Sequence, residues 1–193
     1  MQKIQLVLAT NNQHKVREIR NILPECFELL SLKDAGVVEE LPETSGTIEG
    51  NASQKALRVW ELTGYDCIAD DSGLEVESLD GRPGVHSAYF AGEPRNDDRN
   101  LVFLLDQMEG VNNRRANFVT VIALVRAGEV LLFEGKVFGS ITNRRQGTGG
   151  FGYDPVFIPE GHTQTFAELG DEIKNRISHR ALALGKLRDF LEK

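Results

Sequence analysis

The sequence has few cysteines and no long hydrophobic run. Its 193 residues include only two cysteines, Cys26 and Cys67, which lie far apart and form no CxxC pair, so neither a disulfide framework nor a zinc site is expected. Both are interpreted as small hydrophobic residues of the core. No apolar stretch approaches membrane-spanning length, and the N-terminus leads into a strand rather than a signal peptide. These absences predict a cytoplasmic location.

The sequence also has fewer basic than acidic residues. The 22 Lys and Arg residues against 29 Asp and Glu give a formal net charge of −7, which argues against nucleic acid or an anionic membrane as a partner. An acidic protein that binds a polyphosphate needs a local cluster of Lys and Arg, or a divalent cation. The chain length suggests one domain, large enough to bury its core without disulfide or metal support.

The sequence does contain a regular alternation of strand-like and helix-like segments. Strands are predicted at residues 4–9, 27–30, 67–69, 118–126 and 130–141. Helices are predicted from a cap at Asn11 or Asn12, and at 47–63, 96–108, 171–177 and 179–191. No repeat or linker interrupts this order. The pattern therefore predicts a mixed-sheet α/β fold in a single domain that spans residues 1–193.

Asp70 and Asp71 are the most unusual pair in the chain. The apolar run Cys67–Ala69 is predicted as a buried strand that ends at the two carboxylates, where Ser72-Gly73 turns the chain. Adjacent carboxylates repel each other, so a fold keeps them mainly where a cation or a proton transfer uses them. Alternatively the pair opens a turn, because Asp and Ser favour turns. These residues alone leave both interpretations open.

Two further segments carry residues suited to phosphate and metal. Thr10 to Lys15 lie where the first strand passes into a helix, and a helix N-terminus with a lysine attracts anions. A plain helix cap with a solvated lysine is the alternative. Glu43 precedes the helix that carries Lys55, and its carboxylate offers the hard oxygen ligands that suit Mg²⁺. For these two residues the alternative is a solvated loop and helix face.

The glycine-rich segment Gly147–Gly152 formally matches GxGxxG. It lies late in the chain, after a hairpin, and continues into Tyr153-Asp154-Pro155, which resists helix continuation, so dinucleotide binding is rejected. A flexible loop with Phe151 and Tyr153 suits stacking on a planar base, with Asp154 as a hydrogen-bond acceptor. A long hairpin exit with buried aromatic residues explains the same pattern.

The last two predicted helices meet near three potential cations, Lys174, His179 and Arg180. Arg offers fork-like donors, and His can donate or accept. A lone His near a helix start is more often structural. A Ser72-His179-Asp nucleophilic triad is not favoured, because Ser72 lacks the GxSxG context of a nucleophile elbow.

Taken together, these segments closely resemble the inosine triphosphate pyrophosphatase family over nearly the whole chain. Each motif is modest alone, but five in this order are specific. Many members carry Gly at the position of Asn11, and Asn also tolerates left-handed backbone. The matching motifs are T-x-N-x-x-K from Thr10, the segment from Glu43 to Ala56, ADDSGLEV from Ala69, GTGGFGYDP from Gly147 and SHR from Ser178.

The resemblance implies an elongated, strongly twisted mixed β-sheet flanked by helices, with two lobes and a central cleft. It also implies Mg²⁺-dependent hydrolysis of ITP, dITP and XTP to the monophosphate and pyrophosphate, by a protein that is typically a homodimer. Glu43 and Asp71 would bind the metal, with Asp70 as a further candidate. The residues implied in substrate binding are Thr10, Asn11, Asn12, Gln13, His14, Lys15, Lys55, Ser72, Phe151, Gly152, Tyr153, Asp154, Lys174, His179 and Arg180.

For the reaction, we expect water to attack the α-phosphorus while Asp71 accepts its proton. The leaving pyrophosphate would be stabilised by Lys15, Lys55 and Lys174. Arg180 is the expected donor to the 6-oxo group of the purine. Two rival functions remain: a pyrophosphatase of modified pyrimidine or standard triphosphates, and a nucleotide-binding regulator without catalysis. The carboxylates argue against the regulator, since a pure binder needs no base.

Overall fold

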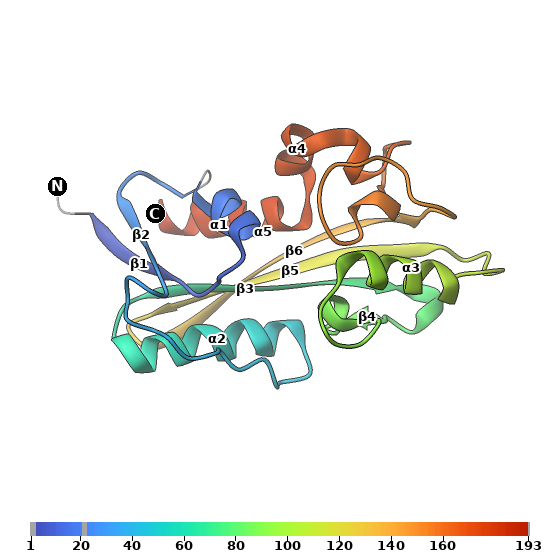
Figure 1. The fold of residues 1–193 in the computed structure, drawn as a ribbon. Coiled ribbons are helices and arrows are strands. Elements are labelled where there is room, and N and C mark those ends of the chain that lie inside the picture. The colour runs from blue at the N-terminus through green and yellow to red at the C-terminus, as the bar shows by residue number, and fades with distance from the viewer. Residues whose placement is uncertain (1–2, 21–22, 193) are drawn as a thin grey trace. The chain divides into compact units, whose positions relative to one another are not determined.

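The structure is a computed structural model that describes residues 3–20 and 23–192, apart from the side chains of Gln13, His14 and Glu18 (Figure 1). Its strands are β1 (Ile4–Leu8), β2 (Phe27–Ser31), β3 (Cys67–Val76), β4 (Pro83–Gly84), β5 (Arg115–Arg126), β6 (Glu129–Ile141) and β7 (Phe157–Pro159). Its helices are α1 (Gln13–Arg20), α2 (Ile48–Thr63), α3 (Asp97–Gln107), α4 (Phe166–Ile177) and α5 (His179–Leu191), with short 3-10 turns at Glu77–Leu79, Ser87–Tyr89 and Asp154–Val156.

These strands form one seven-stranded sheet in the described residues. Their order is β2-β1-β3-β5-β6-β7, with β4 paired to β3. β1 runs parallel to β2, with Ile4 opposite Phe27, and parallel to β3, with Val7 opposite Cys67. β4 joins β3 and β7 joins β6 in antiparallel pairs. Parallel and antiparallel neighbours in one sheet, with helices between strands, confirm the predicted mixed-sheet α/β fold.

The chain divides into two compact units, each with a hydrophobic core of its own. The residues of β3, β5 and β6 are shared out between the two. Unit 1 consists of Met1–Asp71, Thr120–Gly135 and Arg180–Lys193, and unit 2 of Ser72–Val119 and Lys136–His179.

Unit 1 has helices on both faces of its strands: α1 and α5 cover one face and α2 the other (Figure 1). Successive side chains of a strand point to opposite faces, so a strand covered on both faces is apolar throughout. On the α2 face, the thiol of Cys67 donates to the carbonyl of Ala56, with an S–O distance of 2.8 Å. The buried core on the other face consists of Leu6, Leu8, Ile19, Ile68, Ile122, Leu124, Ala183, Leu184 and Leu187.

Helix α2 begins and ends where the sequence predicts. The hydroxyl of Thr47 accepts a hydrogen bond from the N–H of Gly50, at 3.0 Å, and so caps the first turn. Gly64 ends the helix in the left-handed conformation, with φ at 71°, and its N–H donates to the carbonyl of Trp60. Since both caps are local, the sequence alone was sufficient to place this helix.

Strand β3 differs from its prediction. It does not end at the Asp pair but continues through Ser72-Gly73 to Val76. The continuation is explained by its partners, because β3 pairs with β1 near its start and with β4 at Leu74 and Glu75. The expected turn is therefore wrong. Consecutive strand residues project to opposite faces, so Asp70 and Asp71 belong to different surroundings.

Unit 2 has its own core and its own cap signal. Helix α4 starts at a capping box, in which the Thr165 hydroxyl accepts from the N–H of Glu168 and the Glu168 carboxylate accepts from the N–H of Thr165. Gly170, with φ at 77°, interrupts the helix, and the predicted helix at 171–177 is the part that follows it. The buried core consists of Leu74, Val76, Leu79, Leu101, Leu104, Met108, Ala116, Phe118, Ile141, Tyr153, Val156, Phe157 and Phe166.

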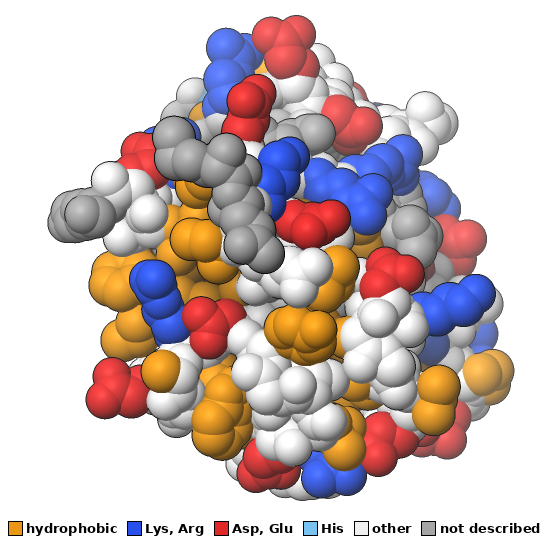
Figure 2. All heavy atoms as spheres, turned by 90° about the vertical axis from the view of Figure 1, so that its left-hand side faces the viewer, with side chains coloured by type: hydrophobic (Ala, Val, Ile, Leu, Met, Phe, Trp, Pro, Cys, Tyr) orange, Lys and Arg blue, Asp and Glu red, His pale blue; other side chains and the backbone are white. Residues whose placement is uncertain are grey.

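The surface mixes both signs of charge. Figure 2 shows acidic, basic and hydrophobic side chains side by side on one face, and no single sign of charge covers that face. Within residues 3–20 and 23–192, no helix has the length and apolar character that crossing a membrane requires. Attraction of an anion therefore depends on local groups of cations.

Candidate active site

Asp70 lies at the centre of a buried group of charges in unit 1. Its Oδ2 atom lies 2.9 Å from the ammonium nitrogen of Lys15 in α1 and 3.4 Å from Nε of Arg180 in α5. The Asp70 side chain is fully buried, whereas those of Lys15 and Arg180 are 15% and 3% exposed. Its Oδ1 atom is buried and accepts no hydrogen bond from a described residue. One carboxylate therefore ties β3 to α1 and α5.

The neighbouring charges determine the protonation of this group. Burial by itself raises the pKa of Asp70, but the positive charges of Lys15, Arg180 and Lys55 lower it overall to well below its usual range. For Lys15, burial is the main cause and lowers the pKa, although the carboxylate of Asp70 opposes the shift. Asp70 is therefore an anion at neutral pH, which suits a fixed counter-ion and not a proton donor.

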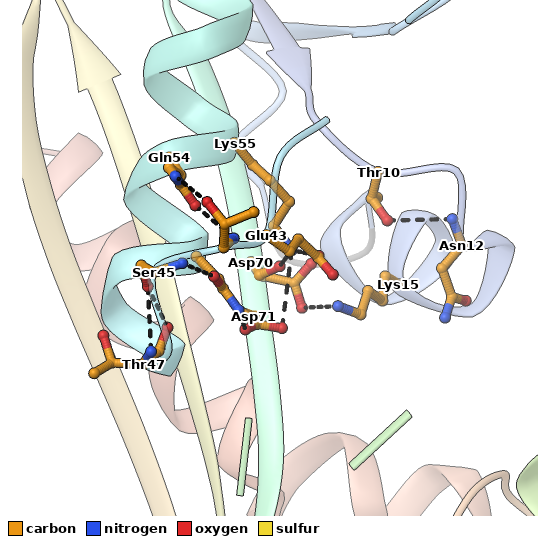
Figure 3. A network of polar contacts seen from close by, with 12 residues as sticks. Thr10, Asn12, Lys15, Glu43, Ser45, Thr47, Gln54, Lys55, Asp70 and Asp71 are labelled. Atoms are coloured by element: carbon orange, nitrogen blue, oxygen red, sulfur yellow. Dashed lines mark hydrogen bonds and ion pairs between the residues drawn. The ribbon is translucent and has the colours of Figure 1, made fainter. Parts of the chain in front are cut away.

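Asp71, the next residue of β3, is less buried than Asp70, and Figure 3 shows it beside the first turns of α2. Asn51 in α2 donates through Nδ2 to Oδ2 of Asp71, at 3.3 Å, and the ammonium of Lys55 lies 3.8 Å from Oδ1. The Asp71 side chain is 14% exposed. A carboxylate with an opposite charge nearby and some access to water can bind a cation or take a proton from water.

Lys55 connects both acids to Glu43. Its ammonium donates to Oε1 of Glu43, at 2.5 Å, and to the main-chain carbonyl of Asp70, at 2.8 Å (Figure 3). Burial by itself lowers the pKa of Lys55, but the charges of Asp71, Asp70 and Glu43 raise it overall. The ammonium is therefore protonated at neutral pH.

The loop that carries Glu43 is fastened to α2. The N–H of Thr44 donates to the side-chain oxygen of Gln54, and the Gln54 amide donates back to the Thr44 hydroxyl, both at 2.9 Å. The N–H of Ser45 donates to Oδ1 of Asn51, at 3.1 Å. These bonds hold the Glu43 carboxylate, which is 47% exposed, beside the first turns of the helix.

Glu43 and Asp71 fit a divalent cation. Both present a carboxylate oxygen to one cationic atom, the ammonium nitrogen of Lys55, so this place between them already stabilises a positive charge. Mg²⁺ is commonly held by one or two carboxylates, with water and substrate phosphate in the other positions. In the part of the chain that the structure describes, no group of three or more His, Cys, Asp or Glu could hold a metal ion. An ion here would thus rely on two carboxylates, water and substrate.

The T-x-N-x-x-K segment forms the passage from β1 to α1. The N–H of Asn12 donates to the hydroxyl of Thr10, at 3.2 Å, and the carbonyl of Asn12 accepts the first helical hydrogen bond from Val16, at 3.0 Å. Asn12 therefore caps α1, one of the two predicted alternatives. Among the other predicted residues of this segment, the side chain of Asn11 is exposed, and the side chains of Gln13 and His14 lie outside the described residues.

In unit 2, predicted base-binding residues form a cluster around Asp154. Its Oδ2 atom accepts from the N–H of Phe151, at 2.8 Å, and from the ammonium of Lys174, at 2.6 Å. The same ammonium lies 4.2 Å from the centroid of the Phe151 ring, a cation–π contact. Gly150 and Gly152 both have positive φ, and a Cβ on Gly150 would collide with the Asp154 carboxylate. The buried ion pair thus fixes the glycine-rich loop.

Two of the predicted residues, Tyr153 and His179, are buried as the structural alternative for each had it, and Ser72 lies in a strand where a turn was expected. Tyr153 is only 5% exposed and its hydroxyl donates to the carbonyl of Ser87, at 2.9 Å, so its ring packs in the core and is not an open surface for stacking on a base. His179 is also buried, and its ring stacks on Phe118 with centroids 4.7 Å apart. Ser72 lies within strand β3 and not at a turn.

Asn51 is a residue of this site to which the sequence interpretation gave no role. It bonds to both Asp71 and the N–H of Ser45. Residues four apart share a helix face, so its spacing from Lys55 was an available signal. The charged residues that the structure brings together in unit 1 are Lys15, Glu43, Lys55, Asp70, Asp71 and Arg180.

Comparison with known proteins shows the family to which the chain is similar. A model described as the Ham1 family matches residues 6–190. A dITP/XTP pyrophosphatase of Porphyromonas gingivalis is 55% identical over 187 residues, which cover 96% of each chain.

Solved structures agree as well. The Ham1 protein of Staphylococcus aureus has a TM-score of 0.91 at 38% identity and covers 97% of this chain and 98% of its own. A nucleoside-triphosphatase / dITP/XTP pyrophosphatase of Mycobacterium abscessus has a TM-score of 0.82 at 42% identity and covers 95% of this chain and 98% of its own. These matches confirm the resemblance drawn from the five motifs, and the chain belongs to the Ham1 family.

Proposed function

We propose that this protein hydrolyses the non-standard purine nucleoside triphosphates ITP, dITP and XTP to the monophosphate and pyrophosphate, and so removes them from the nucleotide pool. The observation that carries the proposal is the placement of Glu43 and Asp71 around one cationic atom, in the same unit as the cations bound to Asp70. The substrate class is supported by the relative named a dITP/XTP pyrophosphatase, at 55% identity.

Glu43 and Asp71 are the residues that would hold Mg²⁺. Their donor atoms are the hard oxygens that this ion prefers, and both side chains keep contact with solvent. When bound, the ion would offset phosphate charge and polarise the phosphorus–oxygen bonds. Asp70 is not needed as a ligand, because its carboxylate already binds two cations.

Asp71 is the proposed general base. A water molecule forms the new bond to the α-phosphorus, the bond from this phosphorus to the bridging oxygen breaks, and the water's proton passes to the Asp71 carboxylate. Asn51 donates to Oδ2 of Asp71, at 3.3 Å, whereas Oδ1 is the oxygen that faces the Lys55 ammonium. Lys15 and Lys55 stabilise the charge that develops on the leaving pyrophosphate.

The passage from β1 to α1 is the proposed phosphate contact. Thr10 and Asn12 offer polar side chains there, and the N-terminus of α1 offers backbone N–H groups. Lys15 has one hydrogen bond to Asp70, and an ammonium carries three donors. Asn11, Gln13, His14 and Ser72 complete the set as further proposed substrate contacts.

Recognition of the base is assigned to unit 2. The Phe151 ring is the proposed stacking surface, because its loop is fixed by Asp154 and Lys174. Gly152 and Tyr153 shape the loop from within. His179 is a further proposed contact of the base. Apart from unit 2, Arg180 of unit 1 is the proposed donor to the 6-oxo oxygen that distinguishes hypoxanthine and xanthine from adenine. Its Nε binds Asp70, which fixes the position of the guanidinium.

We further propose that residues 1–193 act as one pyrophosphatase domain, because β3, β5 and β6 supply residues to both units. The protein is proposed to be a cytoplasmic homodimer. Both cysteines are free thiols, which suits a reducing compartment. Light scattering tests the dimer, since it should give twice the chain mass of 21.4 kDa.

The test of function is a panel of purine and pyrimidine triphosphates, each incubated with Mg²⁺ and resolved by ion-exchange chromatography. We expect pyrophosphate and monophosphate from ITP, dITP and XTP, and little product from ATP or GTP. Asp71→Asn is the control for contaminating activity and should lower turnover by at least about 100-fold. Release of orthophosphate alone, or equal turnover of ATP and ITP, would contradict the proposal.

A further inference from the structure

Lys55 occupies an unusual position for a residue expected to bind phosphate. Its ammonium donates to Oε1 of Glu43 at 2.5 Å and lies 3.8 Å from Oδ1 of Asp71, the two carboxylates assigned above to the divalent cation. Figure 3 shows its side chain reaching from α2 toward this group. The side chain is only 8% exposed, so Lys55 is a buried partner of the carboxylates and not a solvated surface lysine.

The ammonium and a divalent cation cannot both sit between these carboxylates. Like charges at a separation of about 4 Å repel strongly at the effective dielectric of a partly buried site. A cation that binds Glu43 and Asp71 must therefore displace Lys55 from them.

We propose that Lys55 is a place-holding cation, which neutralises Glu43 and Asp71 until a divalent cation takes them and thereby releases the ammonium to the phosphates of the substrate. This inference rests on the proposed function, because it requires these carboxylates to be the metal ligands. It assigns Lys55 a second role beside the phosphate contact.

The main chain provides the means to keep Lys55 in place during the exchange. Its ammonium also donates to the carbonyl oxygen of Asp70, at 2.8 Å, and this acceptor belongs to the backbone of β3, which the sheet holds. An ammonium has three donors. Lys55 can thus give up the carboxylates, keep the carbonyl, and direct the freed donors at phosphate.

The exchange couples two binding events. Without nucleotide, the divalent cation must compete with a buried, protonated lysine, so its affinity is reduced. A polyphosphate offers the displaced ammonium a new partner and so raises that affinity. Because coupling between two ligands is reciprocal, the cation raises the affinity for polyphosphate by the same factor.

The test is Mn²⁺ binding, measured by electron paramagnetic resonance of the free ion without nucleotide. Lys55→Met keeps the apolar stem and removes the charge, and we expect it to bind Mn²⁺ at least about tenfold more tightly than the parent, because the competing cation is gone. Lys186→Met is the matched control. It removes the same charge from the same unit, but Lys186 is exposed and donates to the main-chain carbonyl of Glu134, so Mn²⁺ affinity should stay within about threefold.

A second measurement adds inorganic tripolyphosphate. In the parent it should strengthen Mn²⁺ binding, and in Lys55→Met this gain should be largely lost. Lys55→Arg keeps the charge and should keep parental Mn²⁺ affinity, which separates a charge effect from altered packing. Unchanged or weaker Mn²⁺ binding in Lys55→Met, or equal tightening in both Met variants, overturns the inference.

Glu43→Gln separates this inference from the proposed function. If it leaves Mn²⁺ binding unchanged, Glu43 is not a ligand, and the proposed metal site fails together with the inference. If it weakens Mn²⁺ binding while Lys55→Met has no effect, the metal site stands and only the place-holding role fails. Should Lys55→Met not fold, Lys55→Gln gives the same comparison with a polar side chain.

Discussion

The Asp70→Asn substitution should destabilise unit 1 strongly. It keeps the size of the side chain but removes the charge to which Lys15 and Arg180 both bind, at 2.9 and 3.4 Å. Removal of one partner of a buried ion pair typically costs about 3–5 kcal/mol, because the other charge is left buried and uncompensated. We expect the lower part of that range, since the Lys15 side chain is 15% exposed and retains some hydration.

Asp71→Asn is the matched control at the next residue of the same strand. Asp71 is partly exposed, its ion pair with Lys55 is long at 3.8 Å, and the oxygen of the introduced amide can still accept from Asn51. The expected loss is about 1 kcal/mol or less. Turnover should nevertheless fall by at least about 100-fold, because the substitution removes the proposed general base. Asp70→Asn should thus mainly lower the stability of the protein, whereas Asp71→Asn should mainly lower its turnover.

Urea unfolding followed by fluorescence measures this difference. Trp60 is the only tryptophan of the sequence and lies in α2, so it reports on unit 1. With an m value of about 2–3 kcal/mol/M, a loss of about 3 kcal/mol lowers the midpoint by about 1–1.5 M. Asp71→Asn should lower it by less than about 0.5 M. Equal midpoints in the two variants, or a larger loss at Asp71, would refute the assignment of Asp70 as the fixed counter-ion.

The ion pairs of Asp70 also predict how the stability of the protein changes at acidic pH. Because the pKa of Asp70 is lowered in the folded protein, its contribution to stability is complete above the unfolded value of about 4 and is lost as the pH falls through the folded value. The stability difference between the parent and Asp70→Asn should therefore stay constant from about pH 7 to 5 and shrink below about pH 4. A difference that grows on acidification would contradict this reasoning.

Two further predictions follow from unit 2 and from the thiols. Lys174→Met leaves the buried Asp154 carboxylate without its cation. The urea midpoint should therefore fall by about 1 M, and the KM for ITP should rise more than kcat falls. An unchanged midpoint and an unchanged KM would show that the ion pair does not fix the loop. Burial raises the pKa of Cys67 to about 12, whereas Cys26 is exposed, so a thiol reagent at pH 8 should label one cysteine in the native protein and two in urea. Labelling of both in the native protein would contradict the buried placement of Cys67.

Local signals in the sequence were sufficient for elements whose determinants are local. Thr47 and Gly64 cap α2 at its two ends, and the helix predicted at 47–63 agrees with these ends. The hairpin between β5 and β6 follows from Ala127 and Gly128, which both have positive φ as the tight turn requires. The short first turn of α4 was missed, although Thr165 and Glu168 have the spacing of a capping box.

The Asp pair could not be placed by such signals. Asp and Gly are depleted in strands and Ser favours turns, and the sequence therefore favoured a turn. Part of what keeps β3 extended lies far away in the chain: the partner strand β1, and cations that are 55 residues before Asp70, at Lys15, and 110 residues after it, at Arg180. Tertiary contacts override the local turn preference of these residues, and no short segment of the sequence contains all the residues that keep β3 extended.

The charge balance in unit 1 explains how an acidic chain can bind a polyphosphate at all. Three cations face three carboxylates in the cluster, which is therefore close to neutral although the chain carries a net charge of −7. Asp70 is fully buried and fixes the positions of Lys15 and Arg180. Asp71 and Glu43 are partly exposed and can exchange theirs. Metal binding would then add positive charge and free Lys55 in one event, so the cluster becomes attractive to a triphosphate only when the cation needed for the reaction is present.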